Sequence, residues 1–257
     1  MEFPEAIARY SREHRLSLQD AAQVFLQILV LRHLSESRAR FMGGTALVLG
    51  YGNPRFSEDV DLSQVSDPIA LKPGLVKTAA EIEGWFSCPV KLTPPKKDGR
   101  TWRLTLRLGR AESIALHVDS QPYRAYSTQP LILQYPSIPG FVVEAMSLDE
   151  IMAEKLMAVA YRRYLGGRDL FDLWFHVLRN SEIDSRFQSI RGYVAKKLRE
   201  RMLAYSDFHQ RLTARLSPST SLTRAELEWK RYLPSDLQKA SIFKEIVTAC
   251  GRIPGFF

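Results

Sequence analysis

Two short segments decide the fold of this chain. The first is Phe41-Met42-Gly43-Gly44-Thr45-Ala46-Leu47, and the second is Arg55-Phe56-Ser57-Glu58-Asp59-Val60-Asp61-Leu62. The second segment alternates between polar and apolar residues, which places Asp59 and Asp61 on one face and predicts a strand. The first predicts a short helix between two tight turns, because a glycine pair precedes it and Gly52-Asn53-Pro54 ends it.

The two aspartates of the strand suit a metal site. Side chains at alternate positions of a strand point the same way, and two like charges held close together are costly without a cation. Mg²⁺ is commonly held by one or two carboxylates together with phosphate oxygens and water, so Asp59 and Asp61 predict a metal–nucleotide site, with Mn²⁺ as the alternative ion. The competing interpretation is a solvent-exposed strand face with two ordinary aspartates.

The glycine pair adds a possible phosphate site. Gly43 and Gly44 allow a ligand to approach the backbone closely, and a helix that starts near Thr45 presents free N–H groups to a triphosphate. A turn without a ligand is the alternative for the glycines alone. Their position one short helix before Asp59 favours a cleft in which phosphate and metal meet.

These segments resemble the opening motif of the DNA polymerase β-like nucleotidyltransferase superfamily. The resemblance is closest to the AbiEii/AbiGii toxin family, whose pattern is Gly-Gly-Thr-x-Leu followed by Arg-x-Ser-x-Asp-Ile-Asp-Leu; Val60 stands where isoleucine is commoner. Further along, the family's lysine-bearing helix and its Arg-Asp-x-x-Asp-Leu helix match Glu154-Lys155-Leu156 and Arg168-Asp169-Leu170-Phe171-Asp172-Leu173. The resemblance spans Phe41 to Trp174.

The resemblance implies a Mg²⁺-dependent nucleotidyltransferase that transfers NMP from an NTP to an acceptor. It implies the toxin of a bacterial toxin–antitoxin or phage-defence pair, with a cognate antitoxin as partner. Asp59 and Asp61 would bind metal, and Lys155 would steady the triphosphate or the leaving pyrophosphate. The nucleotide would also contact Gly43, Gly44, Thr45, Arg55 and Ser57.

Three further carboxylates are candidates for the catalytic base or for orienting the acceptor: Asp119, Asp169 and Asp172. Asp119 ends a predicted strand, where a turn residue is the alternative. Asp169 and Asp172 lie one turn apart on a helix, where they can orient an acceptor, pair with Lys155 or cap the helix. Lys155 itself lies at the edge of an apolar helix face, and a surface lysine is the alternative.

Composition narrows the class of protein. The chain has 257 residues, of which 45% are hydrophobic and 25% charged, as in ordinary globular proteins. We expect a cytoplasmic protein with no membrane anchor and no disulfide, because no apolar run spans a bilayer, no export signal begins the chain, and only two cysteines are present. Motifs of P-loop NTPases, serine hydrolases and zinc proteases are absent.

The predicted elements give an α+β fold, with a polymerase β-like core built on a small mixed sheet and a C-terminal helical region. A hairpin is predicted from 101–108 and 113–119 around Gly109-Arg110, and a capping box at Ser147-Leu148-Asp149-Glu150 begins the helical region. Helices are predicted at about 18–34, 168–178, 187–204, 224–232 and 237–250. The Pro136–Gly140 segment suggests a core at 1–140 and a helical domain at 141–257 that completes the active-site cleft.

The net charge of +8 favours an anionic partner. One predicted helix is rich in basic residues: Arg191, Lys196, Lys197, Arg199 and Arg201. We expect Lys197 and Arg201 to form a face that docks an RNA acceptor, most directly a tRNA 3′ end, with Tyr193 or Tyr205 stacking on a base. The alternatives are a merely solvated helix face, a small-molecule (antibiotic) or protein acceptor, a non-catalytic nucleotide-binding module, and a structural nucleic-acid-binding protein.

Overall fold

The computed structural model describes residues 3–107, 113–179, 181–217, 222–234 and 237–257. The chain divides into two compact units. Unit 1 comprises Met1–Gly50 and Ser57–Met146, and unit 2 comprises Tyr51–Phe56 and Ser147–Phe257. The expected boundary after residue 140 falls inside a strand, β7, and the assignment of two domains at 1–140 and 141–257 stays a prediction.

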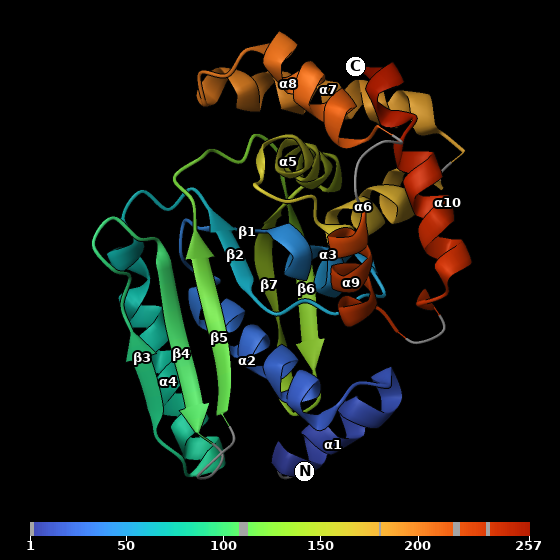
Figure 1. The fold of residues 1–257 in the computed structure, drawn as a ribbon. Coiled ribbons are helices and arrows are strands. Elements are labelled where there is room, and N and C mark those ends of the chain that lie inside the picture. The colour runs from blue at the N-terminus through green and yellow to red at the C-terminus, as the bar shows by residue number, and fades with distance from the viewer. Residues whose placement is uncertain (1–2, 108–112, 180, 218–221, 235–236) are drawn as a thin grey trace. The chain divides into compact units, whose positions relative to one another are not determined.

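Unit 1 is built on one seven-stranded mixed sheet with the order β3-β4-β5-β2-β1-β7-β6 (Figure 1). Its strands are β1 (Arg40–Met42), β2 (Val60–Ser63), β3 (Val90–Thr93), β4 (Thr101–Arg107), β5 (Ser113–Ser120), β6 (Thr128–Tyr135) and β7 (Ile138–Met146). The pairs β1–β7 and β2–β5 are parallel, and the other four are antiparallel. The central position of β2 places the aspartate motif in the middle of the sheet.

The helices of the first 146 residues are α1 (Phe3–His14), α2 (Leu18–Leu34), α3 (Gly43–Tyr51), the 3-10 helix η1 (Pro68–Leu71) and α4 (Lys72–Phe86). Helix α2 has the predicted bounds, and Ser17 caps it by accepting a hydrogen bond from the Asp20 N–H. It packs on α4 and on β5, β6 and β7, so 12 of its 17 residues are buried. The short helix predicted after the glycine pair is α3.

The predicted hairpin is confirmed as β4–β5, whose strands pair from Thr101↔Asp119 to Arg107↔Ser113. Its turn at Gly109-Arg110 lies outside the described residues. A second hairpin, β6–β7, was not predicted: Pro136 and Ser137 form its turn, and Ser137 has a left-handed backbone with φ 69°. The Pro136–Gly140 segment therefore contains a tight turn within the sheet, and its Pro139 and Gly140 lie in β7.

Unit 2 is helical apart from short connections. Its elements are α5 (Leu148–Tyr161), α6 (Gly167–Leu173), the π-helical turn η2 (Trp174–Leu178), α7 (Ile183–Glu200), α8 (Tyr205–Arg215), α9 (Thr223–Tyr232), α10 (Ala240–Cys250) and the 3-10 helix η4 (Ile253–Phe256). Helix α5 packs against α6, α7 and α8. Together the sheet and these helices confirm the predicted α+β class.

The capping box predicted at the start of α5 is wrong. Ser147 occupies the N-cap position but makes no side-chain cap bond, and its buried Oγ has no hydrogen-bond partner among the described residues. Glu150 is fully buried and pairs with Lys197 instead. An ion pair with a second helix has replaced the local hydrogen bonds of a capping box.

In the described ranges, we find no helix that combines the length and apolar character needed to cross a bilayer. Cys88 and Cys250 are free thiols. Burial raises the pKa of Cys250, whose Sγ lies 3.5 Å from the Leu170 carbonyl oxygen, so this thiol packs the core.

Candidate active site

The pairing of β2 with β5 brings together the three unit 1 carboxylates of the predicted site. In the parallel β2–β5 pair, Asp61 lies opposite Asp119, and the two side chains therefore share a face. Asp59 directly precedes β2, and its Oδ1 lies 3.2 Å from His117 Nδ1 on β5. The strand register thus assembles Asp59, Asp61, Asp119 and His117 along one stretch of the sheet.

Negative charge is crowded at this point. Burial raises the pKa of Asp59, His117 partly offsets that shift, and the charges of Asp119 and Glu58 add to it. Within the described ranges, no three Asp, Glu, His or Cys side chains already form a metal-binding cluster. Carboxylates that repel one another, completed by substrate oxygens and water, are nevertheless what Mg²⁺ uses, so the donor set fits a metal that arrives with a nucleotide.

Gly43 lies where the glycine segment approaches β2. Its backbone is left-handed, with φ 77°, and a Cβ at this position would overlap the carboxylate of Asp61. Gly43 begins α3, whose first turn contains no acidic residue. The free N–H groups at the start of this helix therefore lie beside the Asp61 carboxylate, as a site for phosphate and metal requires.

We expect Gly43→Ala to lower the free energy of unfolding more than Gly52→Ala. Both glycines have a left-handed φ, which costs a side chain about 1 kcal/mol, but a Cβ at Gly52 meets nothing within 4 Å. The overlap with Asp61 adds about 1–3 kcal/mol. Urea unfolding of both variants measures the difference, and equal losses would show that the contact with Asp61 is unimportant.

The hydroxyl groups of Thr45 and Ser57 are buried and engaged. Thr45 Oγ1 lies 2.8 Å from Ser57 Oγ and also contacts the Asp59 carbonyl oxygen. Gln27 donates to the Ser57 carbonyl and Gln23 to the Glu58 carbonyl, at 2.8 and 2.7 Å. These side chains hold the backbone that leads into Asp59. The two glutamines were missed as site residues, although polar residues in an otherwise apolar helix were the available signal.

The remaining predicted residues form a buried ion cluster in unit 2. Lys155 Nζ lies 2.9 Å from Asp169 Oδ1 and 2.8 Å from Asp172 Oδ2, and its side chain is 8% exposed. Arg55 donates to both oxygens of Asp172, at 2.6 and 2.9 Å, and Arg162 lies 2.6 Å from Asp169. Of the roles considered for the two aspartates, pairing with Lys155 is the one that the structure contains.

The cations of this cluster keep both carboxylates ionised. Burial opposes ionisation of Asp172, but Arg55 and Lys155 outweigh it and hold the pKa well below its usual range. The pKa of Asp169 is likewise lowered, because Lys155 and Arg162 together outweigh the effect of burial. Carboxylates with such low pKa values are weak bases, so Asp119 is the better candidate for accepting a proton.

Asn53 and His176 complete the cluster and were not predicted. Asn53 Nδ2 donates to Asp172 Oδ1 at 2.8 Å and lies 3.2 Å from His176 Nε2. Burial lowers the pKa of His176 to about 4, so the ring is neutral and its Nε2 accepts from Asn53. The segment between α3 and Ser57 is thereby fixed to α6 and η2 by Asn53 and Arg55.

The predicted docking face on α7 is wrong. Lys197 is fully buried, 2.8 Å from both Glu150 Oε1 and Glu154 Oε1, and Arg201 contacts both oxygens of Glu154 at 2.8 Å. These residues face α5, on which α7 packs. The face of α7 that contains Lys197 is therefore buried. The exposed basic residues of α7 are Arg191, Lys196 and Arg199.

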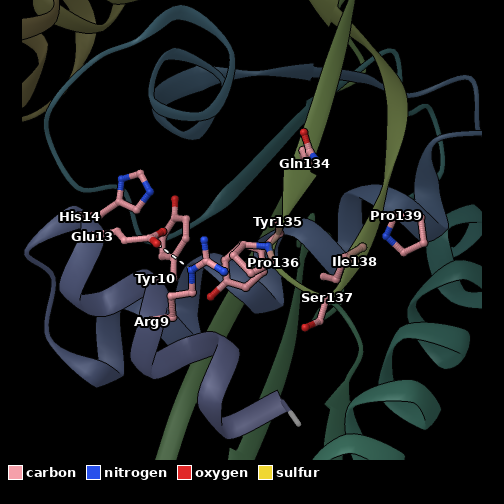
Figure 2. Close-up of a pocket in the computed structure, with 10 residues that line it drawn as sticks. All are labelled: Arg9, Tyr10, Glu13, His14, Gln134, Tyr135, Pro136, Ser137, Ile138 and Pro139. Atoms are coloured by element: carbon pink, nitrogen blue, oxygen red, sulfur yellow. Dashed lines mark hydrogen bonds and ion pairs between the residues drawn. The ribbon is translucent and has the colours of Figure 1, made fainter. Parts of the chain in front are cut away.

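A separate open pocket of about 610 Å³ lies between α1 and the β6–β7 turn (Figure 2). Tyr10 stacks between His14 and Tyr135, with ring centroids 4.0 and 4.6 Å apart, and Arg9 pairs with Glu13 at its edge. None of the predicted site residues lines this pocket. The candidate active site is therefore elsewhere, at β2, β5 and α3.

A mixed sheet with a glycine-led helix beside paired aspartates is the arrangement that the resemblance to nucleotidyltransferases implies. The family model described as "Nucleotidyl transferase AbiEii toxin, Type IV TA system" matches residues 25–249. The chain belongs to this family of nucleotidyltransferase toxins, which confirms the resemblance found in its motifs.

Two solved structures share the fold over nearly the whole chain. The nucleotidyltransferase toxin MenT4 of Mycobacterium tuberculosis is 21% identical, with a TM-score of 0.59 over 97% of this chain and 98% of its own. The protein JHP933 of Helicobacter pylori is 20% identical, with a TM-score of 0.56 over 93% of this chain and 92% of its own. Among curated proteins, none matches significantly.

Proposed function

We propose that this toxin transfers a nucleoside monophosphate from an NTP to RNA, most directly to the 3′ end of a tRNA. The observation that carries the proposal is the placement of Asp61 and Asp119 on adjacent strands, with Asp59 directly before β2, beside the glycine-led start of α3. The type IV toxin family supports a cognate antitoxin as a further partner.

Asp59 and Asp61 would hold Mg²⁺, or Mn²⁺ in its place. When bound, the metal would neutralise triphosphate charge and polarise the α-phosphate. Gly43, Gly44 and Thr45 would bind phosphate oxygens through the backbone N–H groups that begin α3, since the Thr45 hydroxyl is engaged within the core. Ser57, in the segment that precedes Asp59, would also contact the phosphate oxygens of the nucleotide.

Asp119 would be the base. Thr101 Oγ1 donates a hydrogen bond to Asp119 Oδ1, which leaves Oδ2 to accept the proton of the attacking hydroxyl. The hydroxyl oxygen forms a bond to the α-phosphorus, the bond from that phosphorus to the bridging oxygen breaks, and pyrophosphate leaves. Asp169 and Asp172 would orient groups of unit 2 through their ion pairs and would not accept this proton.

Lys155 would steady the triphosphate or the leaving pyrophosphate as a compact positive charge. Arg55 is 1% exposed and is bound to Asp172 through two nitrogens, while its Nη1 donates to the Phe56 carbonyl. We therefore assign Arg55 a positioning role: it fixes the segment between α3 and the metal strand, in place of the direct phosphate contact expected from the sequence.

RNA is the favoured acceptor because the chain carries a net charge of +8 and its unit 2 surface is rich in arginine. An antibiotic or protein acceptor keeps the same chemistry. The test incubates the protein with Mg²⁺, total bacterial RNA and each α-labelled NTP in turn. We expect label in RNA of tRNA size for at least one NTP. Label found only in a protein or small molecule would show that RNA is not the acceptor. No label with any NTP would favour a nucleotide-binding module without transferase activity.

A further inference from the structure

An exposed aromatic residue in unit 2 is surrounded by arginines. Tyr164 follows α5 and is 44% exposed. The Arg224 guanidinium carbon lies 3.6 Å from the centroid of its ring, and that of Arg163 lies 5.1 Å from it. Arg224 comes from the start of α9, so two segments far apart in the sequence build this surface.

The surrounding backbone is held by a third arginine. Arg215, at the end of α8, donates through Nη2 to the carbonyl oxygens of Arg162 and Arg163, at 2.7 and 3.3 Å. The Tyr164 segment is thus anchored to α8 as well as to α9. Side chains ordered in this way lose less entropy when they bind a ligand.

Positive charge at this surface exceeds negative charge. Arg163 and Arg224 are exposed, and neither forms an ion pair in the described part of the chain. Nearby carboxylates are already engaged: Asp169 is buried against Arg162 and Lys155, and Glu228 pairs with Arg168 and accepts from the Gly167 N–H. An anionic ligand therefore meets two guanidinium groups that have no counter-ion among the residues that the structure describes.

The residue that precedes Arg163 belongs to the buried cluster. Arg162, whose side chain is 49% exposed, lies 2.6 Å from Asp169, and Asp169 lies 2.9 Å from Lys155. The backbone that carries Arg163 and Tyr164 is therefore tied, through Arg162 and Asp169, to the lysine proposed to steady the triphosphate.

We propose that Arg163, Tyr164 and Arg224 form a docking surface for the single-stranded end of the RNA acceptor. The inference rests on the proposed function and specifies where its substrate binds. An unpaired base stacks on the Tyr164–Arg224 platform, since bases stack on both aromatic rings and guanidinium planes. Arg163 and the edge of Arg224 bind the flanking phosphates.

The experiment measures binding of a fluorescein-labelled single-stranded RNA of about 12 nucleotides to the full chain by anisotropy, without NTP or metal. We expect Arg163→Gln/Arg224→Gln to weaken binding about ten-fold near 100 mM salt. The slope of log affinity against log salt should flatten by about 1.4, since each phosphate contact in a single strand contributes about 0.7. The matched control is Arg191→Gln/Arg199→Gln, which removes the same charge from the exposed face of α7 and should change affinity less than about two-fold.

Stacking is tested separately from charge. Tyr164→Ala should weaken binding about ten-fold, and Tyr164→Phe, which keeps the ring, should bind as the wild type does. Thermal unfolding confirms that each variant is folded. Equal weakening by the two arginine double variants, or wild-type binding by Arg163→Gln/Arg224→Gln, would overturn the docking surface.

The outcome is separable from that of the transfer assay. Because binding is measured without NTP or metal, Asp59→Asn should bind this RNA as tightly as the wild type does. Nucleotide transfer to another acceptor combined with no RNA binding defeats the docking surface and leaves the enzyme class in place. If RNA binding depends on Arg163 and Arg224 but no nucleotide is transferred, the proposed reaction is wrong and the docking surface is still supported.

Discussion

Asp59→Asn and Asp61→Asn are each expected to lower nucleotide transfer at least about 1,000-fold while the protein stays folded. Asparagine keeps the shape of the side chain but lacks the charge that holds a divalent cation. Burial and the neighbouring carboxylates raise the pKa of Asp59, so its charge is unfavourable in the folded protein near neutral pH. Asp59→Asn should therefore unfold at the same temperature as the wild type or slightly above it.

The matched control is Glu58→Gln, which removes a negative charge from the same segment. Glu58 supplies its backbone carbonyl to Gln23, and this contact survives the substitution. Transfer should remain within about three-fold of the wild type, because screening leaves only a weak effect of a nearby charge. If Asp59→Asn and Asp61→Asn both transfer nucleotide at the rate of Glu58→Gln, the aspartates do not form a metal site.

Lys155→Met is expected to lower both stability and transfer. The methionine keeps most of the apolar stem, but Asp169 loses its buried partner and Asp172 retains only its bonds to Arg55 and Asn53. Breaking a buried ion pair from one side costs about 3–5 kcal/mol. We expect a lower midpoint of urea unfolding, together with a fall of at least about 100-fold in transfer.

A double-variant cycle separates the structural role of Lys155 from contact with the nucleotide. Asp169→Asn removes one of the two carboxylates that hold the lysine, and Lys155→Met/Asp169→Asn restores the charge balance. The double variant should therefore be more stable than Lys155→Met. NTP affinity should nevertheless be about ten-fold lower than in Asp169→Asn alone. Equal NTP affinity in those two variants would mean that the lysine serves the fold only.

The sequence predicted what short-range patterns determine. Helix α2 begins where Ser17 caps it, because an N-cap depends on residues three positions apart. The β4–β5 hairpin follows from alternation along each strand. The motif containing Asp59 and Asp61 identified the family because its spacing is dictated by one strand and one helix.

The failures in the candidate site involve partners that are far apart in the chain, whereas the missed β6–β7 hairpin is a local turn at Pro136 and Ser137. Lys197 pairs with Glu150, which lies 47 positions away, and nothing within either helix reveals that the two meet. Arg55 pairs with Asp172 across 117 positions, so a residue read as a phosphate contact is bound inside the fold. Charged residues on a helix carry no local mark of burial, because an ion pair with a second helix compensates the loss of water.

The brief passage of the chain through unit 2 at Tyr51–Phe56 has an evolutionary consequence. The C-terminal helices are encoded as one continuous stretch after Ser147, so a recombination event at that junction would exchange all of them together. It would also leave Asp172 without its native Arg55 and Asn53, which are encoded more than a hundred codons earlier. Relatives that exchange the helical region must therefore keep a matching arginine in the N-terminal half, and this constraint ties the inheritance of the two parts together.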